Sequence, residues 1–232
     1  MSLFYDLHIH SCLSPCGDED MTPNNIVNMS YLKGLDIIAV TDHNSAGNVR
    51  AVCNAAKGKI KVVPGIEVTT SEEVHVLCYF GSVEAAEDMG EFLKTNMSGI
   101  KNNVEIFGRQ LLLNEEDEIV GEEENLLISA VNLDIYDVER ETHKRGGIFV
   151  PAHIDRSSYS ITANLGFLPP DLNADAIEIT ESGLNIYKEK YQDFTIITDS
   201  DAHFLENISE KNVFLDNAVK KNQKIFDFLC KF

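Results

Sequence analysis

The 232-residue sequence has no apolar run that approaches the ~20 residues needed for a transmembrane helix. Its first residues, MSLFYDLHIH, lack the basic segment and the following apolar segment of a secretory signal peptide. These two absences predict a soluble, cytoplasmic protein that does not act at a membrane.

Cysteine is scarce and irregularly spaced. An odd number of cysteines in a chain of this length argues against a disulfide scaffold, so the thiols are expected to be reduced and mostly buried. Cys16 is the exception, because it lies among residues that could bind a metal ion. The five cysteines are Cys12, Cys16, Cys53, Cys78 and Cys230.

Basic residues are also few. The chain has 19 Lys and Arg against 38 Asp and Glu, which gives a formal net charge of −19. The resulting long-range repulsion disfavours long duplex nucleic acid and anionic membranes as partners. A small phosphorylated substrate remains compatible with this charge, because bound divalent ions would add positive charge at the site itself.

Repeats and several catalytic motifs are missing as well. The sequence has no internal repeat and no low-complexity linker, which favours a single domain over residues 1–232. It has no GxSxG motif and no glycine-rich phosphate loop, so mechanisms that depend on them lack support. The strongest local change in composition is the acidic stretch 115–124, which predicts an exposed hairpin or a small insertion near residues 109–128.

What the sequence does contain is a series of short apolar runs typical of buried strands, with helical segments between several of them. Strands that alternate with helices form a mainly parallel sheet, so the pattern predicts an α/β fold. A closed barrel and an open doubly wound sheet both satisfy it, and the positions of the polar residues favour the barrel. The seven runs are residues 4–10, 35–41, 61–69, 74–80, 147–153, 176–179 and 195–198.

Helix boundaries are marked by capping residues. Thr22, followed by proline, predicts a helix start, and Gly34 suits the end of that helix. Asp134 predicts the start of another helix, which the glycines at 146–147 would close. A last helix is expected from about Asn217.

Histidine placement is the most informative feature. Six of the seven histidines lie in or at the ends of predicted strands, and only His143 lies on a predicted helix, where a surface position is expected. His8 and His10 point to the same face of the first strand, because strand side chains alternate. Two imidazoles on one face can converge on one metal ion, whereas a single buried histidine is usually a satisfied core residue.

Polar side chains recur where the apolar runs end. Active sites of α/β folds form at the carboxyl ends of strands, so these side chains are expected to converge. A carboxylate after a buried run, such as Glu67, is costly unless it is paired. If the last strand stays extended, Asp199, Asp201 and His203 share a face. The strand-end residues are His8, His10, Asp42, His43, Glu67, His153, Asp201 and His203, and a hairpin adds His75.

The ligand types indicate which metals would bind. Imidazoles and carboxylates with almost no thiolate suit Zn, Mn or Fe. Structural zinc sites are usually closed by four ligands, whereas this larger set suits two or three divalent ions that share a carboxylate, which is a catalytic arrangement.

In order and spacing these motifs resemble those of the PHP (polymerase and histidinol phosphatase) domain family. The resemblance covers most of the chain, from residue 6 to residue 203, and implies a distorted (β/α)7 barrel with a trinuclear metal site. The matching motifs are HxH at residues 8–10, TDH at 41–43, PGxE at 64–67, the HxL histidine at 75, AH at 152–153 and SDAH at 200–203.

The resemblance also implies how the ligands divide among the ions, with Glu67 bridging the first and the second. The first ion would take His8, His10, Glu67 and Asp201, the second Glu67, His75 and His153, and the third His43 and His203 with one more ligand after the HxH motif.

That last ligand is where this sequence departs from the family. Family members often place Asp or His five or six residues after the second histidine, and Pro15 and Cys16 occupy those positions here. An acidic run follows, so Asp20 or Asp18 is favoured as a shifted replacement, with Cys16 as the alternative.

Two further residues have roles that stay open. Asp42 is expected to accept a hydrogen bond from a metal-bound imidazole or to help move a proton, and the alternative is a loop cap. Arg156 suits a substrate phosphate, because its planar fork matches the oxygens, and the alternative is a surface salt bridge with Asp155 or another acid. The residues predicted to act in catalysis are Asp42, Glu67, Asp201 and His203.

The favoured function is hydrolysis of a phosphate ester by a metal-bound hydroxide, with a nucleotide, a short oligonucleotide or a small-metabolite phosphate as substrate. One alternative is hydrolysis of a C–N or C–O bond at the same kind of centre, because fold does not settle function. The other is a non-catalytic, metal-binding regulatory module.

Overall fold

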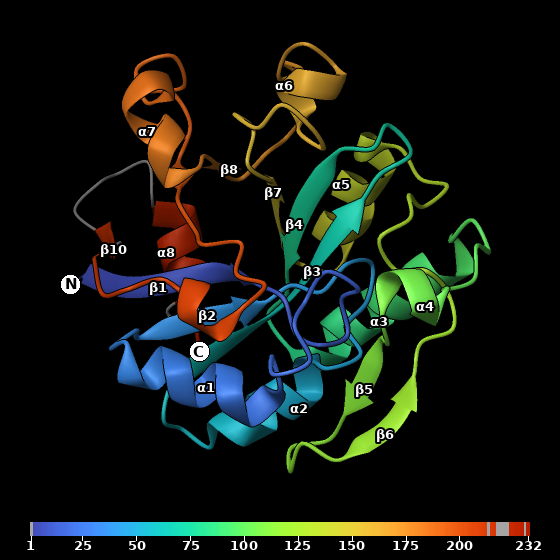
Figure 1. The fold of residues 1–232 in the computed structure, drawn as a ribbon. Helices are drawn as coiled ribbons and strands as arrows, with labels where there is room; N and C mark the ends of the chain where they lie inside the picture. The colour runs from blue at the N-terminus through green and yellow to red at the C-terminus, as the bar shows by residue number, and fades with distance from the viewer. Residues whose placement is uncertain (1, 213, 217–222, 230) are drawn as a thin grey trace.

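The computed structural model describes residues 2–212, 214–216, 223–229 and 231–232. Its central feature is a six-stranded sheet that curls like half of a barrel, with helices on its outer side (Figure 1). The strands of this sheet, in spatial order, are β10 (Phe214–Asp216), β1 (Ser2–Ile9), β2 (Ile37–Val40), β3 (Lys61–Thr69), β4 (His75–Tyr79) and β7 (Ile148–Pro151).

The directions of these strands correct one expectation. Two of the five pairings are parallel, β1 with β2 and β2 with β3, and the other three are antiparallel. The sheet is therefore less parallel than predicted, because β4 returns as a hairpin between β3 and β7, and because β10, which the sequence did not predict, pairs with β1. β1, β2, β3 and β7 still run the same way, so their carboxyl ends meet at one edge.

The two remaining predicted strands, β8 (Ile177–Glu178) and β9 (Ile196–Ile197), pair in parallel as a separate small sheet. Hydrogen bonds attach it on both sides. The N–H of Ile154 donates to the carbonyl of Glu178 at 2.9 Å, and the N–H of Ala202 donates to the carbonyl of His8 at 3.1 Å. These bonds do not continue the ladder of the main sheet. The structure is thus a mixed α/β fold with a curled sheet, and a complete (β/α)7 barrel stays a prediction.

Two helices, at residues 23–32 and 135–144, begin and end where their capping residues predict. Thr22 accepts a hydrogen bond from the N–H of Asn25, and Asp134 accepts one from the N–H of Asp137. The predicted start of the last helix, near residue 217, lies outside the described residues. The helices are α1 (Pro23–Leu32), α2 (Val49–Ala56), α3 (Val83–Thr95), α4 (Val104–Phe107), α5 (Ile135–Lys144), α6 (Ile161–Asn164), α7 (Glu181–Tyr187) and α8 (Gln223–Leu229), with a 3-10 helix η1 (Leu205–Asn207).

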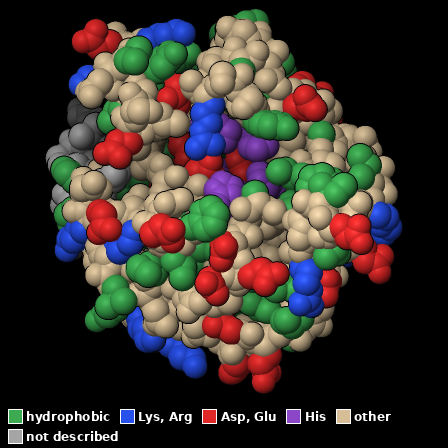
Figure 2. All heavy atoms as spheres, in the orientation of Figure 1, with side chains coloured by type: hydrophobic (Ala, Val, Ile, Leu, Met, Phe, Trp, Pro, Cys, Tyr) green, Lys and Arg blue, Asp and Glu red, His purple; other side chains and the backbone are tan. Residues whose placement is uncertain are grey.

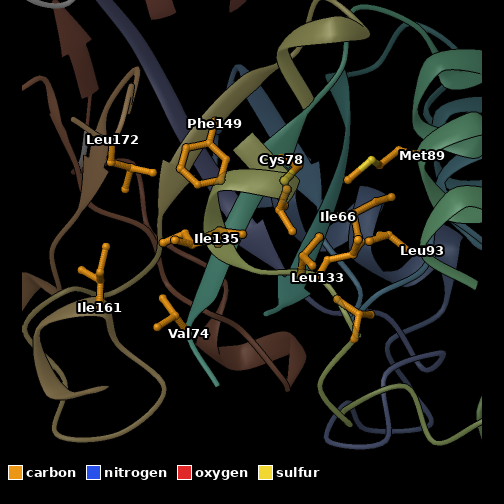
Figure 3. Close-up of a cluster of buried hydrophobic side chains, with 14 of the residues drawn as sticks. Ile66, Val74, Cys78, Met89, Leu93, Leu133, Ile135, Phe149, Ile161 and Leu172 are labelled. Carbon is orange, nitrogen blue, oxygen red and sulfur yellow. The ribbon is translucent and has the colours of Figure 1, made fainter. Parts of the chain in front are cut away.

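Alternate residues of each strand pack on opposite sides of the curled sheet. On β4, Leu77 and Tyr79 face the inside of the curl, where α8 closes the core. Val76 and Cys78 face outward into a second cluster, which α3 and α5 cover (Figure 3). A third cluster lies between α1, α2 and the outer face of β2. Because both faces are covered, the strands read as continuous apolar runs.

An irregularity in β1 decides which way the first two histidines point. Between Asp6 and Ile9 the pairing with β2 shifts, so that β1 contains one extra residue. Before the shift Leu7 packs inside the curl, and after it Ile9 packs outside. His8 and His10 therefore turn inward, to the face that the remaining strand ends also line.

The acidic stretch forms a two-stranded hairpin of β5 (Leu111–Leu113) and β6 (Ile119–Glu122). Leu111 and Leu113 pack against Cys12, and the N–H of Leu111 donates to the carbonyl of Cys12. The hairpin thus supports the loop that follows His10. In the part of the chain that the structure describes, no helix is long and apolar enough to cross a bilayer.

Candidate metal centre

The predicted ligands gather in a hollow at the carboxyl edge of the sheet. Figure 2 shows histidine side chains, with acidic side chains behind them and a basic side chain at the rim. The hollow is a cavity of about 160 Å³. Its lining consists of Cys16, His43, Glu67, His75, Ile128, His153, Arg156, Ser158, Tyr159, Asp201 and His203.

Glu67 lies at the centre of this arrangement. Its side chain is 1% exposed, and its two oxygens lie 2.9 to 3.3 Å from nitrogen atoms of five imidazoles. Oε1 faces His8, His75 and His153, and Oε2 faces His10 and His43. The residue lies inside β3, which continues to Thr69, rather than at the strand end that the sequence predicted.

The register of the hairpin explains the contact between Glu67 and His75. Glu67 pairs with Leu77, and Thr69 pairs with His75. Glu67 and His75 are therefore diagonal neighbours on one face of an antiparallel pair, within reach of each other. The distance from His75 Nδ1 to Glu67 Oε1 is 2.9 Å.

Asp201 is the second carboxylate of the cluster. Its Oδ1 lies 3.2 Å from Nε2 of His8 and 3.1 Å from Nε2 of His10, and its carbonyl accepts from Nδ1 of His203. The chain is not extended here, because β9 ends at Ile197 and Asp201 has a φ of +50°. The expectation that Asp199, Asp201 and His203 share a strand face is therefore wrong. Asp199 turns away and accepts from the N–H of Leu7 at 2.6 Å.

His153 also reaches the cluster through an unusual backbone conformation. Strand alternation puts Val150 and Ala152 inside the curl and Phe149 outside, so an extended His153 would point outward. Its φ of +27° turns the side chain back toward Glu67. Non-glycine residues with positive φ carry a conformational cost and gather at functional sites.

Three groups of side chains have the spacing of a metal site, with potential ligand atoms within 4.8 Å of one another. Asp18 and Asp20 belong to none of these groups among the described residues, and Cys16, the alternative, belongs to one. Asp18 and Asp20 lie outside the groups because Asp18 accepts a hydrogen bond from the N–H of Asp20 and because Asp20 is exposed. The groups are His8, His10 and Asp201; His43, Glu67 and His75; and His10, Cys16, His43 and His203.

The carboxylates and imidazoles of the cluster shift one another's pKa. Burial alone raises the pKa of Glu67, but the imidazoles of His75, His8 and His43 outweigh it and hold that pKa well below its usual range. Burial lowers the pKa of His10, and the nearby carboxylates of Asp201 and Glu67 then raise it to about 9. Burial holds the pKa of His43 well below its usual value.

Several buried polar atoms of the cluster lack a hydrogen-bond partner. They are Nε2 of His8, Nδ1 of His43, both ring nitrogens of His75, Nδ1 of His153 and Oε2 of Glu67. Buried polar groups without partners are costly, and native structures contain few of them. Imidazole nitrogens and carboxylate oxygens in this state are suitable ligands for divalent ions, so the residues present fit a metal centre.

Glu178 was missed by the sequence analysis. It is buried, its Oε1 lies 2.9 Å from Nδ1 of His8, and its Oε2 accepts from the N–H of His153 at 2.6 Å. With Nδ1 of His8 donating to this carboxylate, the Nε2 lone pair is left for a cation. The signal was available, because Glu178 interrupts the apolar run Ile177 to Ile179.

Asp42 lies behind the cluster and accepts three hydrogen bonds, from the N–H and hydroxyl of Ser11 and from the hydroxyl of Ser14. The only proton of the Ser14 hydroxyl is thus given to Asp42, so its oxygen accepts from Nδ1–H of His10 at 3.0 Å. Asp42 therefore orients His10 through Ser14, with Nε2 of the ring facing the carboxylates. It does not line the cavity.

Arg156 stands at the rim, where its Nη1 lies 2.5 Å from Oδ2 of Asp201. Its side chain is 42% exposed. Asp155, proposed as a salt-bridge partner, instead accepts from the N–H and hydroxyl of Thr180, which caps α7. His143 stays apart on α5, where its Nε2 lies 2.9 Å from Asp175. It is partly buried rather than a free surface residue.

The cysteines divide as follows. Cys12 and Cys78 are buried, Cys16 and Cys53 are partly exposed, and all four are free thiols. Cys230 lies outside the described residues.

Comparison with known proteins places this geometry in context. A metal-dependent phosphoesterase described from Bifidobacterium adolescentis has a similar fold, with a TM-score of 0.65 and 18% identity over 98% of this chain and 96% of that one. The lesion-specific endonuclease PfuEndoQ from Pyrococcus furiosus has a TM-score of 0.66 and 18% identity over 97% of this chain and 55% of its own.

A curated relative matches part of this sequence. A 5'-3' exoribonuclease from Haemophilus influenzae is 32% identical over 81 residues, which is 33% of this chain and only 28% of the exoribonuclease. The PHP domain family matches residues 6–161, about two thirds of the chain. The chain therefore belongs to the PHP domain family.

Proposed function

We propose that the protein is a phosphoesterase whose divalent ions are held around Glu67. The observation that carries the proposal is a single buried carboxylate in contact with five imidazoles. Glu67 would bridge two ions, one also held by His8, His10 and Asp201, and the other by His75 and His153. His43 and His203 would hold a third. Zn, Mn or Fe suits these ligands.

When bound, the ions would stabilise negative charge on phosphoryl oxygens and lower the pKa of a water molecule. The chain supplies the remaining functions. Glu178 and Ser14 fix the ring orientation of His8 and His10, so that Nε2 of each faces inward. Arg156 has a planar set of donors at the cavity rim, where it would contact a phosphate oxygen. It is already positioned by Asp201.

The shape of the site favours a terminal or small phosphate ester. The cavity of about 160 Å³ admits a phosphate group but not a bulky substrate in full. A nucleotide, a short oligonucleotide or a small-metabolite phosphate satisfies this limit. The exoribonuclease among the similar proteins favours a nucleic-acid end within that range. The lesion-specific endonuclease makes duplex nucleic acid worth testing as well, despite the acidic net charge of the chain.

The test is a panel of phosphomonoesters, nucleotides, oligonucleotides, amides and lactones, assayed with Mn, Zn and Mg. The expected result is phosphoester hydrolysis that a chelator abolishes and that Mn or Zn restores. Metal-loaded protein that cleaves only amides or lactones would establish the alternative hydrolase. Protein that binds metal but turns over nothing in the panel would establish a binding module.

A further inference from the structure

We propose that Cys16 gives a thiolate to the third ion, and that this ligand makes that position of the centre selective for zinc over manganese and magnesium. The inference rests on the proposed metal centre but not on the identity of its substrate. It departs from the oxygen or imidazole ligand that the family resemblance implies at this place.

The first support is geometric. Cys16 forms a group with His10, His43 and His203, in which potential ligand atoms all lie within 4.8 Å of one another. Cys16 also lines the cavity together with His43 and His203. His10 is already assigned to the first ion, so the third ion would take Cys16, His43 and His203. Three protein ligands are the number that catalytic zinc sites keep, with the fourth position left open.

A second and independent observation is the state of His43. Its side chain is 4% exposed, and its buried Nδ1 lies 3.1 Å from Oε2 of Glu67 but has no partner in hydrogen-bond geometry. A buried imidazole nitrogen in this state is costly unless a cation takes its lone pair. Cys16 and His43 offer potential ligand atoms within 4.8 Å of each other, so one ion could contact both residues.

The backbone explains why Cys16, and not the acidic run after it, reaches the site. The N–H of Gly17 donates to the carbonyl of Ser14, and the N–H of Asp18 donates to the carbonyl of His203. A Cβ on Gly17 would lie 2.3 Å from the carbonyl oxygen of Ser11, so only glycine fits this tight turn. The turn leaves the side chain of Cys16 on the cavity side and ties the loop to the His203 segment.

Ligand chemistry then decides the metal. Thiolate is a soft ligand that selects zinc, whereas carboxylate and imidazole also accept manganese, and magnesium prefers oxygen. Binding a divalent ion deprotonates the thiol, so the ligand becomes a full negative charge at the rim of the centre. We expect the Glu67 positions to accept Mn or Zn, and the Cys16 position to prefer Zn.

The experiment replaces the bound metal with Co²⁺, which gives a near-ultraviolet charge-transfer band with thiolate but not with imidazole or carboxylate. Wild-type protein should show this band. Cys16→Ser should lose the band and one bound ion per chain, while it keeps the others. Cys53→Ser is the matched control, since Cys53 is also partly exposed but belongs to no metal group among the described residues, and it should keep the band.

A second variant tests whether Cys16→Ser loses the band only because it misfolds. Cys16→Asp supplies an oxygen ligand, so it should keep the ion count, lack the band and shift the preference of that position from zinc toward manganese. Zinc should also protect one thiol of wild-type protein from alkylation, and magnesium should not. Persistence of the band in Cys16→Ser, or its absence in fully cobalt-loaded wild type, would overturn the proposal.

These readouts separate the two proposals. If cobalt-loaded protein shows the Cys16-dependent band but no phosphoester turnover, the thiolate ligand is supported and the phosphoesterase function is refuted. If it hydrolyses phosphoesters without the band, the phosphoesterase function is supported and the thiolate ligand is refuted.

Discussion

Acidic side chains occupy two contrasting regions of this molecule. In the metal centre, Glu67, Glu178 and Asp201 are largely buried, and imidazoles surround them. In the β5–β6 hairpin, Glu122 and Glu124 lie on the surface, where each pairs with one Arg or Lys. The density of acidic residues in the sequence is higher in the hairpin, yet only the buried set converges.

In this protein, burial and convergence of the carboxylates distinguish the metal centre, whereas local density of acidic residues does not. Exposed ion pairs contribute little, with a median of about 0 to 1 kcal/mol, because water and salt screen them. A buried carboxylate is strongly unfavourable unless neighbouring groups or an ion compensate its charge.

The largest effect is expected for Glu67→Gln. The substitution keeps the shape but replaces one oxygen with an amide nitrogen, which carries no negative charge and does not ligate. We expect a folded protein by circular dichroism that loses metal and at least about a hundredfold in kcat, or ~2.7 kcal/mol. The matched control is Glu122→Gln in the hairpin. Full metal occupancy with near-normal turnover in Glu67→Gln would refute the bridging role.

Glu178→Gln should have the next largest effect. The amide is a weaker acceptor for Nδ1–H of His8, so the ring becomes a poorer ligand and less well oriented. Metal affinity or activity should fall roughly 10- to 100-fold. Metal titration of the purified variant measures this. An unchanged metal affinity would show that Glu178 acts only by accepting the hydrogen bond from the backbone N–H of His153.

Arg156→Ala should have a smaller and more selective effect. If the guanidinium grips a substrate phosphate, kcat/KM should fall about tenfold, or ~1.4 kcal/mol, with metal content unchanged. Steady-state kinetics together with elemental analysis measure both quantities. A loss of metal in this variant would show that Arg156 acts by holding Asp201 in place, because the two side chains are paired.

The smallest effects are expected for Asp18→Asn, Asp20→Asn and Glu122→Gln. None of these carboxylates belongs to a metal group among the described residues, and surface changes usually alter stability by about 0.5 kcal/mol or less. Metal content and turnover should match wild type in all three. Loss of one ion in the Asp18 or Asp20 variant would show that the acidic run provides a ligand of the third ion, and would argue against Cys16 as that ligand.

The apolar pattern of the sequence predicts the strands, and the residues that follow the apolar runs include most of the side chains of the metal centre. Apolar runs defined β1, β2, β3, β4, β7, β8 and β9, and capping residues located α1 and α5. Because parallel strands deliver their carboxyl ends to one edge, the residues after those runs could be expected to meet there. A buried carboxylate such as Glu67 demanded a partner on energetic grounds alone.

How the side chains of the metal centre converge depends on tertiary contacts. The shift in β1 turns His8 and His10 inward, and positive φ angles redirect His153 and Asp201. Cys16 lines the cavity in a loop that a hydrogen bond from Asp18 ties to the distant His203 segment. Strand periodicity is a local property and can be read from sequence, whereas bulges, left-handed residues and loop paths depend on contacts between segments far apart in the chain.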